Sequence, residues 1–452
     1  MNLLLGVALV LGLMILVHEW GHFVVARLFG VRVDVFSIGF GPRLFGIRRG
    51  ATDYRVSALP LGGYVRMAGQ DPSEMDSQGK GISGPGDQLP TGAPDELMSK
   101  PRWQRALISF AGPAVNLIFP VLLLTGLFVA VGVPYPVYLD HHVDVVALPE
   151  STGGSESPLR VGDHLLKIGD VQNPTWEQSL KAIKQVAPGG TLKLEVENNG
   201  TRRNVEVTVK EGMQVDRLLG YAPVRAVLDE VGPSTPAERA RLRENDAIVG
   251  IDGQKIEYWG QFVDRVRGSN GKALKLDVAR KGQVTHVDIT PQQGVTESGE
   301  NIYQIGVAVQ EALAYRRVPF NQGLRDAWLT TRDRIVETIG VVGKLLSGRV
   351  SVRQLQGAVG ISRAAGDAVR RGPLAVILLM VLISVNLGIL NLLPIPILDG
   401  GNILLLTIEG ALRRDLSMAF KERFVQVGLV FLLVLFAFVM YNDVVRLLPI
   451  HS

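Results

Sequence analysis

Two histidines four residues apart, with a glutamate directly after the first, are the residues most suited to chemistry near the start of the chain. They occur in the segment His18-Glu19-Trp20-Gly21-His22. Residues four apart on an α-helix differ by about 40° in rotation, so both imidazoles would point at one site. Imidazole nitrogens suit zinc, and Glu19 would be placed to take a proton from an attacking water. The pattern predicts a hydrolytic zinc site.

The surroundings of this segment favour a site inside a membrane. Leu3 to Val17 contains no charged residue. An ionisable cluster beside such an apolar run is costly in a bilayer and usually serves a function. The alternative is a chance match, because the same spacing also occurs in soluble helices that bind no metal.

A third candidate ligand follows another apolar stretch. Between Asn391 and Gly401, Pro394 and Pro396 would break a helix, and Asp399 is the single carboxylate. At about 1.5 Å per residue, His18 lies roughly 24 Å from the outer end of the first helix and so toward its cytoplasmic end. Asp399 follows the break and would also lie toward the cytoplasmic end. Two histidines and one aspartate would leave the fourth zinc position open for water. An ordinary helix-ending turn is the alternative.

Composition narrows the classes of protein. The chain has 452 residues, of which 47% are hydrophobic, and its length suggests two or more domains. The net charge is only +4 and the basic residues are dispersed, so nucleic-acid binding has little support. The chain has no cysteine, which excludes disulfides and thiolate ligands. Any zinc must therefore be held by histidine and carboxylate side chains.

Four stretches are apolar enough to cross a bilayer, which takes about 20 residues each. They are Asn2–Ala26, Ala111–Val133, Leu374–Leu393 and Val425–Tyr441. A signal peptide is an alternative for the first, but it lacks a basic start and a small-residue cleavage site. Basic residues flank the loop after the first stretch and fill the loop before the fourth, which predicts that both loops are cytoplasmic. Arg370 and Arg371 do not fit this orientation.

The loop after the first stretch has the pattern of a small sheet. Val31–Phe36 alternates between apolar and other residues, Tyr54–Leu59 does so in part, and glycines lie between them. We expect a β-hairpin or small sheet against the membrane face. Its edge strand could pair with an extended peptide near the zinc, or the sheet could only brace the helices.

The central region contains an internal repeat. The segment Leu159–Ile168 recurs as Leu242–Ile251, and the same offset of 83 residues carries Trp176 onto Trp259. We expect two copies of a mixed α/β module of roughly 80–90 residues. The second copy resembles PDZ domains, which capture chain ends or strands at a sheet edge. A spacer role is the alternative.

Together these segments resemble the site-2 protease family of intramembrane zinc metalloproteases, in its bacterial regulator-of-sigma-E protease branch with tandem PDZ domains. The resemblance rests on the histidine segment, on the Asn-x-x-Pro-x-Pro-x-Leu-Asp-Gly pattern at Asn391, and on three further segments: Phe36–Gly41, Pro60–Val65 and Ala111–Asn116. Asn402 stands where many relatives have histidine, but that position is not a ligand in the family pattern.

The resemblance implies roles for particular residues. His18, His22 and Asp399 would hold one Zn²⁺, and Glu19 would be the general base. Asn391 would hold the substrate backbone, or alternatively would link helices as a polar contact. The further candidates for substrate binding are Asn116, Pro394, Pro396, Gly62 and Gly63.

The resemblance also implies a function. The chain would be an intramembrane endopeptidase of regulated intramembrane proteolysis, acting in a stress response on single-span membrane proteins such as anti-sigma factors and remnant signal peptides. An upstream site-1-type protease would trim these substrates first. The enzyme would lie in the bacterial inner membrane, with extracytoplasmic PDZ-like modules and a site toward the cytoplasm. An ion transporter and a membrane-tethered adaptor with an inert zinc site are the alternatives.

The expected architecture is a polytopic α-helical membrane protein with a β region and two PDZ-like domains inserted between its second and third spans. The predicted segments are a first transmembrane helix (1–30), a membrane-associated β region (31–68), a cytoplasmic loop (69–104), a second helix (105–134), two PDZ-like domains (137–220 and 221–312), an amphipathic segment that gates entry or only connects (316–372), a third helix (373–409) and a fourth (424–445).

Overall fold

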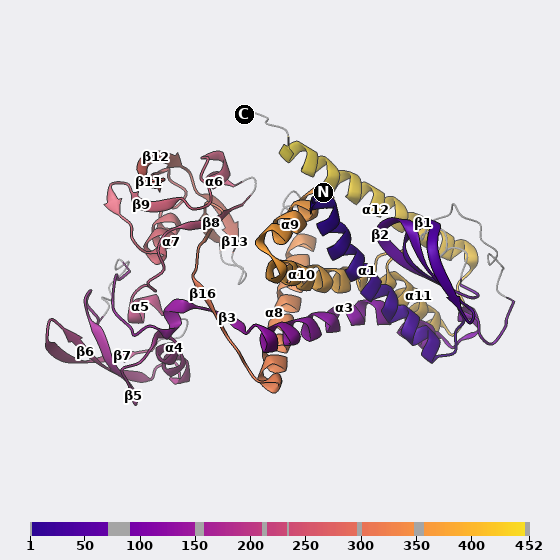
Figure 1. The fold of residues 1–452 in the computed structure, drawn as a ribbon, viewed down its shortest axis with the longest axis horizontal. Helices are drawn as coiled ribbons and strands as arrows, with labels where there is room; N and C mark the ends of the chain where they lie inside the picture. Colours follow the sequence, from indigo (N-terminus) through magenta and orange to yellow (C-terminus); the bar gives the residue numbers. More distant parts are fainter. Residues whose placement is uncertain are drawn as a thin grey trace. The chain divides into compact units, whose positions relative to one another are not determined.

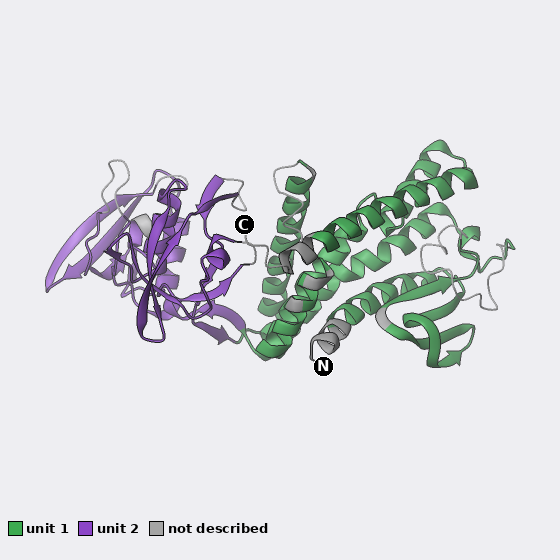
Figure 2. Cartoon of the chain, turned by 90° about the horizontal axis from the view of Figure 1, so that it is seen from above, with its two compact units in different colours: residues 1–132, 317–452 green, residues 133–316 purple. Residues whose placement is uncertain are grey.

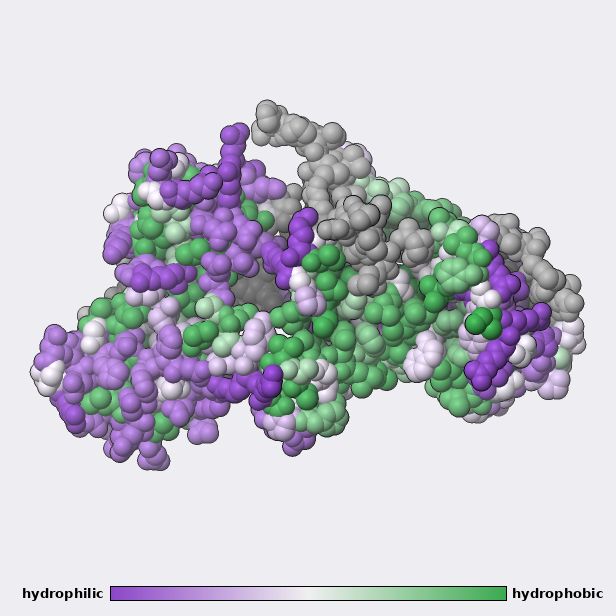
Figure 3. All heavy atoms as spheres, in the orientation of Figure 1, coloured by the Kyte–Doolittle hydropathy of each residue, from purple (hydrophilic) through white to green (hydrophobic). Residues whose placement is uncertain are grey.

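The computed structural model describes residues 2–70, 91–149, 158–209, 215–232, 235–295, 301–347 and 357–447. The chain forms two compact units (Figure 2): unit 1 comprises Met1–Gly132 and Arg317–Ser452, and unit 2 comprises Val133–Arg316. Apolar residues dominate the visible surface of the helices of unit 1, whereas hydrophilic residues dominate that of unit 2 (Figure 3). An apolar outer surface is what a helix bundle presents to lipid rather than to water.

Among the described residues of unit 1, four helices are long and apolar enough to cross a membrane, as the sequence predicts. They are α1 (Asn2–Leu28), α3 (Arg102–Ala130), α10 (Pro373–Asn391) and α12 (Met418–Leu447), labelled in Figure 1. The apolar windows within them are Val10–Leu28, Arg102–Ala130, Pro373–Asn391 and Met418–Tyr441.

The second of these helices differs from its predicted bounds at both ends. It begins at Arg102, directly after Pro101, so residues 102–104 belong to the helix and not to the preceding loop. It ends at Ala130, because Gly132 has φ of +123° and cannot continue a helix. Val133 is extended as the residue before a proline, and it starts strand β3 (Val133–Pro136).

Small residues bring three of these helices close together. A Cβ at Gly21 of α1 would lie 2.5 Å from the carbonyl oxygen of Ala111 in α3. A Cβ at Gly388 of α10 would lie 2.9 Å from the side chain of Leu117 in α3. Close backbone approach at small residues is the usual means of packing helices in lipid. Helix α3 therefore lies against both α1 and α10.

The expected break follows α10. After Asn391 the chain leaves the helix, and a separate helix, α11 (Asp399–Leu412), begins at Asp399. A Cβ at Gly400 would overlap the carbonyl oxygen of Leu393, and one at Gly401 would overlap that of Ile395. The two glycines therefore let the first turn of α11 fold back against the loop.

The β region is one long hairpin of β1 (Val33–Arg49) and β2 (Thr52–Met67), longer than the alternation predicts. It is bent, because residues 35–38 of β1 pair both with 63–66 and with 53–56 of β2. The first half of β1 is thus an interior strand. Among the described strands, none pairs with the other edge of 63–67. A short 3₁₀ turn, Leu97–Ser99, precedes α3.

Unit 2 contains two modules with the same strand order. The first consists of β4 (His164–Ile168), β5 (Val171–Gln172), α4 (Trp176–Gln185), β6 (Thr191–Asn198) and β7 (Thr201–Thr208). The second consists of β9 (Ala247–Ile251), β10 (Gln254–Lys255), α7 (Trp259–Gly268), β11 (Leu274–Arg280) and β12 (Gln283–Ile289). The sheet orders, β5-β4-β6-β7 and β10-β9-β11-β12, correspond element by element. The repeat in the sequence is therefore a repeat in topology.

An aspartate shared by both copies is buried in each module. Asp163 accepts hydrogen bonds from the Arg160 N–H and from Arg203, which is 2.5 Å away. Asp246 is bonded in the same way to the Arg243 N–H and to Arg280, at 2.7 Å. Each carboxylate ties the turn before the first strand of its module to a later strand.

Shorter elements complete unit 2. They are η2 (Val137–Asp140), α5 (Asp216–Leu219), β8 (Leu228–Val231), α6 (Pro236–Arg239), β13 (Gln292–Val295), β14 (Asn301–Gln304), β15 (Val307–Val309) and β16 (Leu313–Arg316). Strand β16 pairs with β3, so the first and last strands of the unit close it. Residues 233 and 234, between β8 and α6, lie outside the described residues.

The predicted amphipathic segment forms two helices of unit 1. Helix α8 (Phe320–Leu346) contacts α3 and α10, and the hydroxyl of Thr338 donates to the side-chain oxygen of Asn386 at 3.0 Å. Helix α9 (Ala358–Arg371) contacts α1. Trp328 of α8 remains exposed. Both helices therefore pack against the apolar helices, and α8 also carries apolar surface. Their role as a gate stays a prediction.

Candidate metal centre

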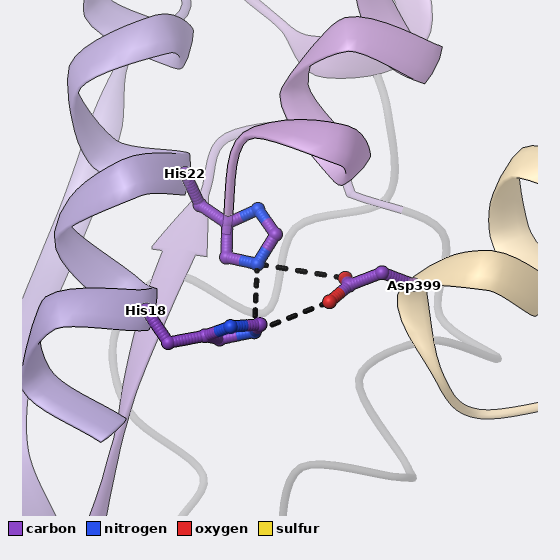
Figure 4. A group of neighbouring side chains, drawn as sticks. All are labelled: His18, His22 and Asp399. Carbon is purple, nitrogen blue, oxygen red and sulfur yellow. Dashed lines mark hydrogen bonds and ion pairs between the residues drawn. The ribbon is translucent and has the colours of Figure 1, made fainter. Parts of the chain in front are cut away.

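Three side chains from two distant parts of the chain converge in unit 1. His18 and His22 project from one face of α1 toward Asp399 at the start of α11 (Figure 4). The Nε2 atoms of the two histidines are 3.2 Å apart. Asp399 places Oδ2 3.1 Å from the Nε2 of His18 and Oδ1 3.5 Å from the Nε2 of His22.

These distances fit a zinc ion. Ligand atoms about 2.0–2.1 Å from a tetrahedral zinc lie about 3.3 Å from one another, close to the three separations found here. Both histidines are buried, with exposed fractions of 7% and 8%. Two imidazoles and a carboxylate form the donor set of a catalytic zinc site, which keeps a fourth position for water or substrate.

Glu19 lies beside this group on α1 but is not one of the three converging side chains. Its Oε2 accepts a hydrogen bond from the backbone N–H of Val65 in β2, at 3.0 Å. A Cβ at Gly63 would lie 3.5 Å from the Cγ of Glu19. The side chain of Glu19 therefore extends from α1 to the unpaired edge of the sheet, where it could act as a base.

The geometry of the loop before α11 brings Asp399 to the histidines. Ile397 adopts φ of +80°, a conformation that β-branched residues rarely adopt, and turns the chain immediately before the helix. Asp399 then occupies the first turn of α11, where a negative charge is favoured by the helix dipole. No spacing rule in the sequence predicts the strained Ile397.

Helix α3 supports both imidazoles from behind. The Nδ1 of His22 lies 2.7 Å from the carbonyl oxygen of Ile108, and the Nδ1 of His18 lies 3.2 Å from the side-chain nitrogen of Asn116. A Cβ at Gly112 would overlap the His22 ring. The sequence places Gly112 in the Ala111–Asn116 segment, but its role in making room for the imidazoles is visible only in the structure.

A cavity of about 220 Å³ adjoins the three side chains. Glu19, Asn391 and Asn402 are among its lining residues near the histidines. Arg105, Glu409 and Lys421 also line it, and the sequence does not point to them as part of the site. The cavity is large enough for several waters beside the candidate ligands.

The predicted substrate-binding residues differ in their positions. The side-chain nitrogen of Asn391 is 3.4 Å from the Nε2 of His18, and this residue is partly exposed. Pro394 is exposed, and Pro396 packs against Gly428 of α12. Gly62 has φ of +118° and faces the Phe40 ring, where a side chain would not fit.

Asn116 does not fit the predicted substrate role. It is 0% exposed, so it offers no surface to a substrate. Its contact is with His18, on the side of the ring that faces away from Asp399.

A buried His-His-Asp group with a glutamate beside it, formed where the bilayer-length helix α1 meets the start of α11, defines a membrane-embedded metal-dependent hydrolase. The model of peptidase family M50 matches residues 6–435 of the chain. The regulator of sigma-E protease RseP of Escherichia coli is 31% identical over 461 residues, which cover 97% of each chain. Protease RseP of Yersinia pestis is 31% identical over 462 residues, again 97% of each. A putative zinc metalloprotease of Neisseria meningitidis is 28% identical over 473 residues, which cover 99% of this chain and 100% of the relative.

The chain belongs to peptidase family M50, and it is a zinc metalloprotease of the membrane. The prediction of zinc as the cofactor is confirmed at the level of the family.

Proposed function

We propose that this chain is an intramembrane endopeptidase that cleaves the transmembrane segments of single-span proteins, such as anti-sigma factors and remnant signal peptides. The observation that carries the proposal is the convergence of His18, His22 and Asp399 beside Glu19, where α1 meets the start of α11. Helix α11 packs against α3, and both α1 and α3 are helices of membrane-spanning length. A hydrolytic site inside such helices can act on a peptide that is itself within the bilayer.

The proposed roles follow from the geometry. His18, His22 and Asp399 hold the zinc ion, which when bound polarises the scissile carbonyl and acidifies water. Glu19, oriented by the Val65 N–H, takes a proton from the attacking water and delivers it to the leaving amine. Asn391, partly exposed beside His18, donates a hydrogen bond to the substrate backbone.

The edge of the sheet is the proposed docking site for the substrate. A substrate must be extended at the scissile bond, because a helix keeps its carbonyls in internal hydrogen bonds. Along the unpaired edge, the N–H of Val65 donates to Glu19, and that of Met67 lies 3.4 Å from the side-chain oxygen of Gln70. By the period of two in a strand, Gly63 presents its backbone to the same edge. Gly63 is therefore the position at which we expect a substrate strand to pair first.

The proposed setting is the bacterial inner membrane. Because basic residues surround the loops after α1 and before α12, those loops would be cytoplasmic and unit 2 would be extracytoplasmic. The candidate ligands would then lie toward the cytoplasmic side. The two modules would act as PDZ-like domains that exclude bulky ectodomains, so an upstream site-1-type protease would have to trim each substrate first.

The test compares wild type with Glu19→Gln, purified in detergent, on a truncated single-span substrate. Bound zinc is quantified in both. We expect cleavage by wild type alone, with equal zinc in the two proteins. The matched control is Glu422→Gln, the same change at an exposed residue, which should cleave normally. Full zinc without cleavage of any substrate in a panel would instead favour the inert adaptor.

A further inference from the structure

Each of the two imidazoles has a polar contact with helix α3. The Nδ1 of His22 is 2.7 Å from the carbonyl oxygen of Ile108. Further along α3, the side-chain nitrogen of Asn116 lies 3.2 Å from the Nδ1 of His18. In each histidine, Nδ1 contacts α3 and Nε2 faces Asp399.

The identity of the group behind each ring decides its tautomer. A neutral imidazole carries one N–H, and a histidine that gives Nε2 to a metal must carry its proton on Nδ1. A backbone carbonyl can only accept, so Ile108 selects this tautomer for His22. The amide of Asn116 can either donate or accept, so its orientation matters for His18.

The tautomer of His18 that binds a metal through Nε2 requires the oxygen of Asn116, and not its nitrogen, to face the ring. With its nitrogen toward His18, the oxygen Oδ1 of Asn116 is buried and has no hydrogen-bond partner among the described residues. Oxygen and nitrogen of a side-chain amide are distinguished only through their partners. Rotation of the amide by 180° brings Oδ1 to the Nδ1–H of His18, the one hydrogen bond that this tautomer can make on that side of the ring.

The backbone of Asn116 is held in place from the opposite side. Pro120, four residues later, has no N–H, so the carbonyl oxygen of Asn116 has no helical donor. The hydroxyl of Ser384 in α10 donates to this carbonyl at 2.7 Å. Asn116 is thus fixed between α10 and the histidine.

We propose that Asn116 is a positioning residue for zinc. Its side-chain oxygen accepts the Nδ1–H of His18 and fixes the tautomer that offers Nε2 to the metal. Partners of this kind behind a metal-binding histidine typically contribute 10–100-fold to metal affinity. The inference rests on the zinc site and not on the substrate, so zinc binding is its main test and peptidase kinetics serve only to detect a substrate contact.

The test measures the zinc dissociation constant of the full-length protein in detergent, by competition with a chelator. We expect Asn116→Leu, which has a similar size but no acceptor, to weaken zinc binding by roughly 10–100-fold. We expect Asn116→Asp to bind zinc at least as tightly as wild type, because a carboxylate accepts the same proton. The control is Thr125→Val, which removes a buried hydroxyl of the same helix that donates to the Val121 carbonyl and should change zinc affinity by less than about threefold.

Three outcomes would overturn the proposal. Asn116→Leu could bind zinc as wild type does, or Asn116→Asp could lose as much affinity as Asn116→Leu. Asn116→Leu could also raise KM alone, which would indicate a substrate contact. If Asn116→Leu does not fold, Asn116→Asp decides by itself, because weaker zinc binding in that variant contradicts the proposed acceptor. Absorption of the cobalt-substituted protein gives a second readout of ligand geometry in either variant.

Discussion

The carboxylate of Glu19 accepts a hydrogen bond from the backbone N–H of Val65, 3.0 Å away. This bond joins the proposed base on α1 to the unpaired edge of β2. The base and the strand that we expect to meet the substrate are therefore coupled by one donor. A substitution that removes only the Val65 N–H keeps the Glu19 carboxylate but no longer orients it, so its effect measures the contribution of that orientation.

Val65→Pro removes that N–H. We expect kcat to fall by about 10–100-fold with bound zinc unchanged, because general-base catalysis contributes about 10²–10⁴-fold and depends on orientation. The loss of side-chain packing is controlled by Val65→Ala, which keeps the N–H. Kinetics on a truncated substrate, together with zinc analysis, measure the effect. Equal losses in the two variants would show that packing and not the hydrogen bond is responsible.

Gly112→Ala should abolish zinc binding. The added Cβ would overlap the His22 ring, and the imidazole cannot move away without leaving the site. Gly126→Ala is the matched control in the same helix, because no atom lies within 4 Å of a Cβ there. Zinc content after purification is the measurement. Normal zinc content in Gly112→Ala would mean that α3 and α1 separate easily.

Glu409 of α11 is a buried centre of charge, 1% exposed. Its Oε2 accepts from Arg105 at 3.1 Å, and its Oε1 accepts from the Leu416 N–H at 3.1 Å and lies 3.0 Å from the Nζ of Lys421. The network joins α3, α11 and α12, and its members Arg105, Glu409 and Lys421 line the cavity that adjoins the candidate ligands.

Glu409→Gln should lower the free energy of unfolding by about 3–5 kcal/mol, since breaking a buried pair leaves two cations without a counter-charge. Thermal or denaturant unfolding in detergent measures this. Asp415→Asn is the comparison. Asp415 is a partner of Arg102 whose side chain is 74% exposed, so its loss should lower the free energy of unfolding by less than about 1 kcal/mol. If both variants lost a similar free energy of unfolding, the burial of Glu409 would not strengthen the contribution of its ion pairs to stability.

Acid should destabilise unit 2 through its two buried aspartates. Burial by itself would raise the pKa of Asp163, but hydrogen bonds from Arg160, Asn198 and Arg203 outweigh it and hold the pKa below its usual value. Burial likewise opposes a lowered pKa at Asp246, and Arg280 with the Arg243 N–H outweighs it.

Each depressed pKa contributes stability above the unfolded value, about 3.9, and this stability is lost as the pH falls through the folded value. We therefore expect the unfolding temperature of unit 2 to drop below about pH 4. Calorimetry of the full chain with Asp246→Asn should show a lower midpoint at neutral pH and a weaker dependence on acid. An unchanged pH dependence would show that other groups control acid unfolding.

Much of the candidate site could be predicted from local sequence. The spacing of His18 and His22 places them on one face of any helix, and the prolines before Asp399 end a helix in any fold. The bent hairpin could not be predicted in the same way, because the double pairing of residues 35–38 depends on contacts between residues far apart in the chain. The burial of Asn116 could not be predicted either, because it depends on how α3 packs against α1 and α10. The sequence therefore placed this residue among the candidates for substrate binding.

By itself, the sequence determined which residues have metal-binding chemistry, which stretches are apolar enough to span a bilayer, and that the central region is duplicated. These properties follow from side-chain type and periodicity, which act over a few residues. Only the tertiary structure decided that Asp399 reaches the two histidines at 3.1 and 3.5 Å, that Val65 orients Glu19, and that Asn116 faces His18. Those relationships depend on the close packing of separate helices and strands, which is a property of the whole chain.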